Sequence, residues 1–161
     1  MKLTKLFTMQ RELDSFIQNN REKQTDVFQE KGLALLVELA ELANETRCFK
    51  FWSTKGPSEE SVILEEYVDS IHFLLSLGIE KELHTLTYWP EGEVEGELTQ
   101  LFLGATVAIH KFLNEIDMPA YEQVWIYYGA IAKKLGFTNE DIIAAYVAKN
   151  EENYNRQKTG Y

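Results

Sequence analysis

Residues 33–43 read LALLVELAELA, and this stretch decides the fold class. Apart from Glu38 and Glu41 every residue in it is apolar, and Glu45 follows Glu41 by four positions. On a helix these three acids fall within roughly 60° of one another, and all other directions are leucine, valine or alanine. A helix that is apolar nearly all round is normally buried, so we expect these carboxylates in a cleft or in the core.

The helix period continues along the rest of the chain, and it lapses only around the three prolines. Asp26 with Gln29, and Thr138 with Asp141, are expected capping boxes, and Gly78 and Gly136 are expected helix stops. The expected helices cover residues 6–20, 26–47, 57–78, 97–116, 119–136 and 138 onward, with an irregular connection over 81–96. The pattern predicts an all-α, single-domain bundle of about six helices over residues 1–161, whose four-helix core carries the acidic site.

Composition narrows the possible partners. The 161 residues are 45% hydrophobic and carry 16 basic against 26 acidic side chains, a net charge of -10. That charge argues against binding to nucleic acid or to an anionic membrane. Cys48 is the single cysteine, so no internal disulfide can form, and no apolar run resembles a signal peptide or a membrane span. We therefore expect a cytoplasmic protein.

A second acidic stripe follows on the next helix. Glu66 and Asp69 lie one turn apart, opposite an apolar side, and Phe73 follows Asp69 by another turn. Crowded carboxylates in low dielectric repel one another, and a multivalent cation relieves this; oxygen ligands favour Mg²⁺ or Mn²⁺. The alternative is that both stripes are solvated faces. A di-iron bundle would need two Glu-x-x-His motifs. Only Asp69 with His72 approaches that spacing, and it occurs once, so we reject a di-iron site.

The two acidic motifs, Glu38-x-x-Glu41 and Glu66-x-x-Asp69, are separated by 24 intervening residues. Together they resemble the metal motif of the all-α nucleoside triphosphate pyrophosphohydrolases. Within that superfamily the chain is most similar to the dimeric dUTPases. Three further segments carry this resemblance, at residues 10–14, 47–52 and 149–161, so it covers nearly the whole chain. The last segment, KNEENYNRQKTGY, narrows the resemblance to dUTPases.

The resemblance implies a homodimer that hydrolyses dUTP to dUMP and pyrophosphate, with dUDP as a further candidate substrate. It also implies that two or more Mg²⁺ ions, with Mn²⁺ as an alternative, are held by Glu38, Glu41, Glu66 and Asp69. Glu38 is the expected catalytic carboxylate, which orients or deprotonates the attacking water. The aromatic-rich stretch 121–128 is the expected dimer interface.

The resemblance also assigns substrate contacts. Gln10 and Asp14 are expected at the uracil edge, although several relatives have Asn in place of Asp14. Trp52 and Phe73 are expected to flank the nucleotide, with Phe73 against C2′ of the sugar, where it would exclude a ribose hydroxyl. The remaining expected contacts, of which the last three bind phosphate, are Lys50, Lys149, Asn153 and Arg156.

Each of these residues also has an interpretation that is purely structural. Positions 149–156 also fit a solvated helix end, Gln10 and Asp14 fit the polar side of an amphipathic helix, and both aromatics fit core packing. For the whole chain, two rivals remain: a related pyrophosphohydrolase that prefers another nucleotide, such as dCTP or a damaged one, and a non-catalytic helical interaction module.

Overall fold

The computed structural model describes residues 1–22 and 25–161, and within them helices dominate. No strand occurs in these residues, and one isolated bridge joins Lys2 to Tyr88. The all-α prediction is therefore confirmed. The six helices are α1 (Thr4–Asn19), α2 (Phe28–Thr46), α3 (Glu60–Glu80), α4 (Leu98–Glu115), α5 (Met118–Leu135) and α6 (Asn139–Lys158).

Local sequence signals explain some of the helix ends. Thr138 and Asp141 form the expected capping box of α6, and Gly136 ends α5 in the left-handed conformation with φ of 80°. The expected capping box of α2 is wrong. Asp26 instead accepts a 2.9 Å hydrogen bond from the Phe28 N–H, two residues on, which is a local turn contact rather than a reciprocal cap.

The third helix differs from its expected bounds at both ends, beginning at Glu60 and running on to Glu80. Gly78 does not stop it. A Cβ at this position would overlap the Tyr121 side chain, so the glycine makes room on α3 for this side chain from α5. Tyr121 also donates to the Leu74 carbonyl at 2.7 Å, which anchors the two helices to each other.

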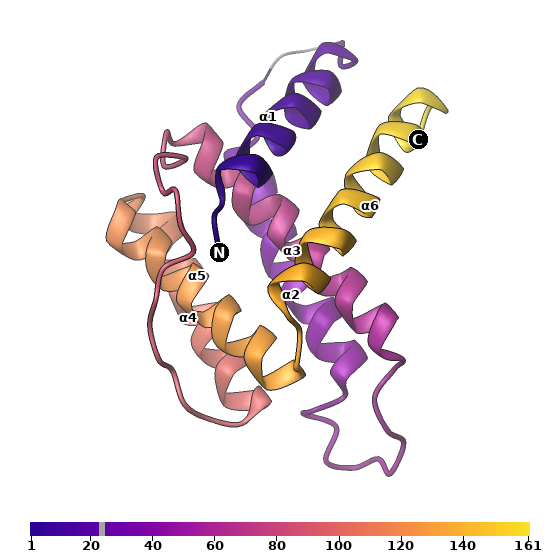
Figure 1. The fold of residues 1–161 in the computed structure, drawn as a ribbon, viewed down its shortest axis with the longest axis vertical. Helices are drawn as coiled ribbons and strands as arrows, with labels where there is room; N and C mark the ends of the chain where they lie inside the picture. The colour runs from indigo at the N-terminus through magenta and orange to yellow at the C-terminus, as the bar shows by residue number, and fades with distance from the viewer. Residues whose placement is uncertain (23–24) are drawn as a thin grey trace.

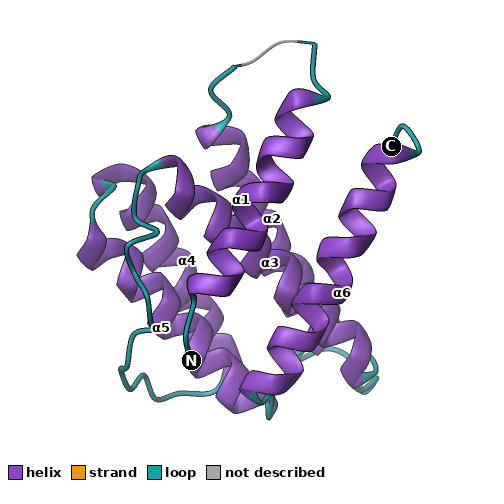
Figure 2. Cartoon of the chain, turned by 45° about the horizontal axis from the view of Figure 1, so that its top comes forward, coloured by secondary structure: helices purple, strands orange, loops and turns teal. Residues whose placement is uncertain are grey.

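The third helix is the centre of the arrangement. It packs against α1, α2 and α6, while α4 packs against α5 and α2. Figures 1 and 2 place α6 on one side of α2 and α3 and the α4–α5 pair on the other. None of the helices in the described residues is long and apolar enough to cross a membrane.

The buried and exposed apolar surfaces differ from two expectations. Tyr121, Trp125 and Tyr128 are fully buried within the chain, so residues 121–128 do not offer the expected dimer interface. Burial of α2 on all sides is also wrong, because Leu33 and Val37 are exposed. On α4, which packs against α2, Leu103 and Val107 are also exposed, by 66% and 69%. We call Leu33, Val37, Leu103 and Val107 the α2–α4 face.

Candidate functional site

A cavity of about 330 Å³ opens among α1, α2, α3 and α6, at the lower end of the volumes typical of small-molecule sites. Segments far apart in the chain meet here, since its walls include residues from Gln10 to Arg156. The predicted site residues that line it are Gln10, Asp14, Glu38, Asp69, Phe73, Lys149, Asn153 and Arg156.

Three carboxylates form a cluster at this cavity, in which Glu38 and Asp69 line the wall and Glu66 lies beside them. Glu38 on α2 and Glu66 and Asp69 on α3 offer oxygen atoms that all lie within 4.8 Å of one another. All three side chains are half-buried. Because α2 packs against α3, the acidic stripes of the two helices meet in this single cluster.

The electrostatics of this cluster are unfavourable for three full negative charges. Burial, followed by the charges of Asp69 and Glu41, raises the pKa of Glu38 to about 7. Burial and Asp69 raise the pKa of Glu66 to about 6. Burial also raises the pKa of Asp69 to about 6, although the Lys149 ammonium opposes that rise. The cluster therefore holds protons at a pH where exposed carboxylates are ionised.

Such a cluster fits a divalent cation. Its donors are oxygen atoms alone, close together and partly removed from water, which is the donor set that Mg²⁺ and Mn²⁺ prefer. Glu41 is exposed and does not belong to the group within 4.8 Å. Its charge nevertheless contributes to the raised pKa of both Glu38 and Glu66.

A lysine from α6 enters the acidic cluster. Lys149 Nζ lies 2.8 Å from Glu65 Oε1 and 3.2 Å from Asp69 Oδ2, and it is almost fully buried. From the sequence, no basic residue stood in either acidic turn, because Lys149 follows Asp69 by 80 positions. The structure therefore gives Lys149 a carboxylate partner in addition to its predicted place on the phosphate-binding face.

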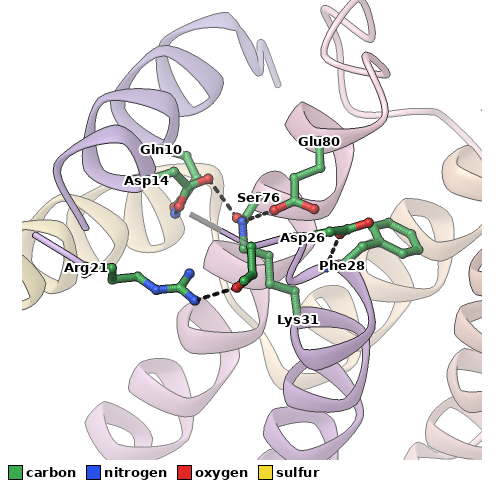
Figure 3. Close-up of polar contacts among 9 residues, drawn as sticks. Gln10, Asp14, Arg21, Asp26, Phe28, Lys31, Ser76 and Glu80 are labelled. Atoms are coloured by element: carbon green, nitrogen blue, oxygen red, sulfur yellow. Dashed lines mark hydrogen bonds and ion pairs between the residues drawn. The ribbon is translucent and has the colours of Figure 1, made fainter. Parts of the chain in front are cut away.

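The opposite end of the cavity is built on hydrogen bonds. Gln10 donates from Nε2 to Asp14 Oδ1 at 2.9 Å, and Ser76 donates to Asp14 Oδ2 at 2.7 Å (Figure 3). His72 Nδ1 lies 2.6 Å from Gln10 Oε1. Sequence reasoning missed Ser76 and set His72 aside, yet both continue the helical stripe that begins at Asp69. That period was the available signal.

A half-buried ion pair supports this end. Lys31 from α2 binds Glu80 on α3, beside Asp14 on the neighbouring α1 (Figure 3). Burial raises the pKa of Asp14, and Ser76, Lys31 and Gln10 oppose that rise. Lys31 thus supplies the countercharge that an Asp at position 14 requires and an Asn would not.

Two predicted substrate contacts lie elsewhere in the single chain. Lys50 and Trp52 belong to the segment between α2 and α3, and neither lines the cavity. Trp52 is 65% exposed and packs edge-on against Phe49 and Phe51. Phe49 in turn lines a groove between α2 and α4, so this aromatic segment adjoins the α2–α4 face.

Comparison with known proteins bears on this geometry. A search of curated proteins found no match. The family model described as dUTPase matches residues 2–161. This match spans every element that builds the cavity, from α1 to the end of α6, and agrees with the resemblance carried by the acidic and C-terminal motifs. The chain belongs to the dUTPase family.

Proposed function

We propose that this member of the dUTPase family cleaves dUTP to dUMP and pyrophosphate with Mg²⁺, in the cavity among α1, α2, α3 and α6. Hydrolysis of dUTP follows from the family. The observation that supports the mechanism is the meeting, in one cavity, of two carboxylates of the cluster, Glu38 and Asp69, with the proposed phosphate-binding face of α6 and the amide of Gln10.

The metal would be held by Glu38, Glu66 and Asp69, with Glu41 as a fourth ligand. We propose two or more ions, with Mn²⁺ able to replace Mg²⁺. Bound divalent ions supply the positive charge that an acidic protein otherwise lacks against a triphosphate. They would also allow the three carboxylates to be ionised together, which their raised pKa values oppose in the metal-free protein.

The chain's own side chains then divide the remaining work. Glu38 is the proposed proton acceptor for the attacking water, because it lines the cavity and, once a cation allows the cluster to ionise, offers a carboxylate that can take a proton. Lys149, Asn153 and Arg156 share one face of α6 along the cavity and would bind the phosphates. Lys149 would exchange its contact with Asp69 for one with phosphate.

Base and sugar would occupy the other end. Gln10 and Asp14 would meet the uracil edge, and Phe73 would pack against C2′ of the sugar. We retain Lys50 and Trp52 as proposed substrate contacts, which would need the segment between α2 and α3 to move or a second subunit to complete the site. Since the substrate is an intracellular metabolite, a cytoplasmic location is part of this proposal, as is dUDP as a second substrate.

We further propose a homodimer that buries the α2–α4 face. Four exposed apolar side chains on adjacent helices form a surface that is unusual on a chain with net charge -10. Introducing glutamates at Leu103 and Val107 should convert a dimer to a monomer in light scattering after size exclusion. A wild-type chain that is monomeric at tens of micromolar would refute the dimer.

The activity test follows dUMP and pyrophosphate release from dUTP, with dCTP as the competing substrate. We expect turnover with Mg²⁺, none in EDTA, and a loss of at least a hundredfold in Glu38→Gln. Glu91→Gln, in an exposed loop, is the charge-matched control. A preference for dCTP would overturn the uracil assignment, and full activity in EDTA would overturn the metal.

A further inference from the structure

The buried amide of Gln10 is held by partners from three helices. It is only 3% exposed, and it lines the cavity together with Asp14 and His72. Its oxygen accepts from the Tyr146 hydroxyl at 2.9 Å and lies 2.6 Å from His72 Nδ1. Its nitrogen donates to Asp14 at 2.9 Å. An amide has nearly the same shape when flipped, so these partners decide which end is oxygen.

The direction of each hydrogen bond follows from the next. Both carboxylate oxygens of Asp14 accept, one from Ser76 and one from Gln10, so the amide nitrogen must face Asp14. The amide oxygen then faces His72, whose Nδ1 must carry the proton. Burial and the nearby Lys149 charge lower the pKa of His72 to about 3, so its ring is neutral and has one N–H.

The remaining imidazole nitrogen agrees with this assignment. His72 Nε2 is buried and has no hydrogen-bond partner among the described residues. In this tautomer Nε2 carries a lone pair and no proton. An N–H left buried without an acceptor would cost more free energy than an unpaired lone pair. His72 is also held by stacking on Tyr146, with ring centroids 4.1 Å apart and planes 18° from parallel.

We propose that His72 and Tyr146 are positioning residues that fix Gln10 as a hydrogen-bond donor, and so prevent the amide flip that would admit cytosine. The two lone pairs of the Gln10 oxygen are taken by His72 and Tyr146, so Gln10 can meet a ligand only through its second N–H. A fixed donor matches the carbonyl at position 4 of uracil and opposes the amino group of cytosine. This inference rests on the proposed role of Gln10 at the base.

The test compares kcat/KM for dUTP and for dCTP, with Mg²⁺, across a set of variants. Tyr146→Phe removes one donor to the Gln10 oxygen, and His72→Phe removes the other while retaining an aromatic ring against Tyr146. We expect the dUTP preference to fall about three- to tenfold in each, since each frees a lone pair of the amide oxygen. His72→Asn places an amide where Nδ1 lies and should restore much of the preference.

Tyr121→Phe is the matched control. Its hydroxyl is equally buried and donates to a backbone carbonyl, yet it lies outside the cavity. It should lower the melting temperature about as much as Tyr146→Phe and leave the preference for dUTP unchanged. A preference lost equally in Tyr121→Phe would reduce the effect to general destabilisation and overturn the proposal.

Gln10→Ala distinguishes the positioning role of His72 and Tyr146 from the proposed contact of Gln10 with the base. If Gln10→Ala loses the preference while Tyr146→Phe and His72→Phe keep it, base reading by Gln10 stands and the positioning role is wrong. If Gln10→Ala itself keeps the wild-type preference, Gln10 does not read the base, and both the base contact and the positioning role are wrong.

Discussion

At the Gln10 end of the cavity the side chains are linked to one another by hydrogen bonds, whereas at the Glu38 end three carboxylates face one another and one lysine contacts Asp69. The side chains of Gln10, His72 and Ser76 are almost fully buried, whereas the three carboxylates are half-buried, and both ends draw on α3. The two ends differ in whether the chain itself provides the groups that satisfy their hydrogen bonds and charges. The Gln10 end is organised by its own side chains, and the Glu38 end is stable only with protons or cations.

This difference separates two tasks of one site. Recognition of a base needs donors and acceptors fixed before the ligand arrives, because reorganisation reduces affinity and selectivity. Metal binding needs the opposite, a concentration of negative charge that the cation relieves. The comparison predicts opposite responses of the two ends to mutation, to Mg²⁺ and to pH.

The largest difference should appear on adding Mg²⁺. At a hundred times its dissociation constant, Mg²⁺ should stabilise the wild-type protein by about 2.7 kcal/mol, or roughly 5–10 °C in melting temperature. Glu38→Gln should lose this gain and, in EDTA, melt above the wild type, because it removes a carboxylate whose neighbours all repel it. Differential scanning calorimetry measures both. A Glu38→Gln variant that melts lower in EDTA would contradict the repulsion at this end.

A pH series should sharpen the same contrast. The raised pKa values of about 7 for Glu38 and about 6 for Glu66 and Asp69 mean that the folded protein binds more protons than the unfolded chain. Their contribution is present below the unfolded pKa of about 4 and is lost as pH rises through 6 and 7. In EDTA the wild type should therefore lose stability relative to Glu38→Gln from about pH 5 to pH 8, and with Mg²⁺ it should gain. A difference that stays flat across this range would contradict the assignment.

The sequence predicted the fold and the Glu38 end for a common reason. Helix period, caps and the two acidic stripes are local patterns, and each is set by residues within a turn or two. The bound that failed at Gly78 has a cause that is not local. Gly78 resembles a helix stop, but its role is to make room for Tyr121, which lies 43 positions away and cannot be seen in a local pattern.

The Gln10 end was predicted only in part for the opposite reason. Gln10 meets His72 and Tyr146 across 62 and 136 positions, and no spacing rule links them. The exposed α2–α4 face was missed because an apolar helix predicts burial without saying what covers it. Tyr121, Trp125 and Tyr128 were assigned to a surface because their aromatic character suits an interface and a core equally.

A smaller effect should distinguish the Gln10 end. Ser76→Ala removes a donor to a buried carboxylate and should destabilise the protein by about 1.5–3 kcal/mol at most, equally in EDTA and in Mg²⁺. Ser61→Ala, exposed on the same helix, should change stability by less than about 0.5 kcal/mol. Urea unfolding of both variants measures the two values. A Ser76→Ala loss that Mg²⁺ abolishes would mean that the two ends are not independent.

The smallest expected effect concerns Lys149, which contacts the carboxylate cluster and is also a proposed phosphate contact. Lys149 occupies the cluster as an internal cation, 3.2 Å from Asp69 Oδ2, so it should compete with Mg²⁺ when no nucleotide is bound. Lys149→Met should therefore bind Mg²⁺ roughly three- to tenfold more tightly in calorimetric titration at pH 8, equivalent to about 1 kcal/mol. Arg156→Met removes the same charge from the same helix but contacts Glu152 rather than Asp69, so its effect should be smaller. Weaker Mg²⁺ binding in Lys149→Met would mean that the lysine holds Asp69 in place for the ion instead of competing with it.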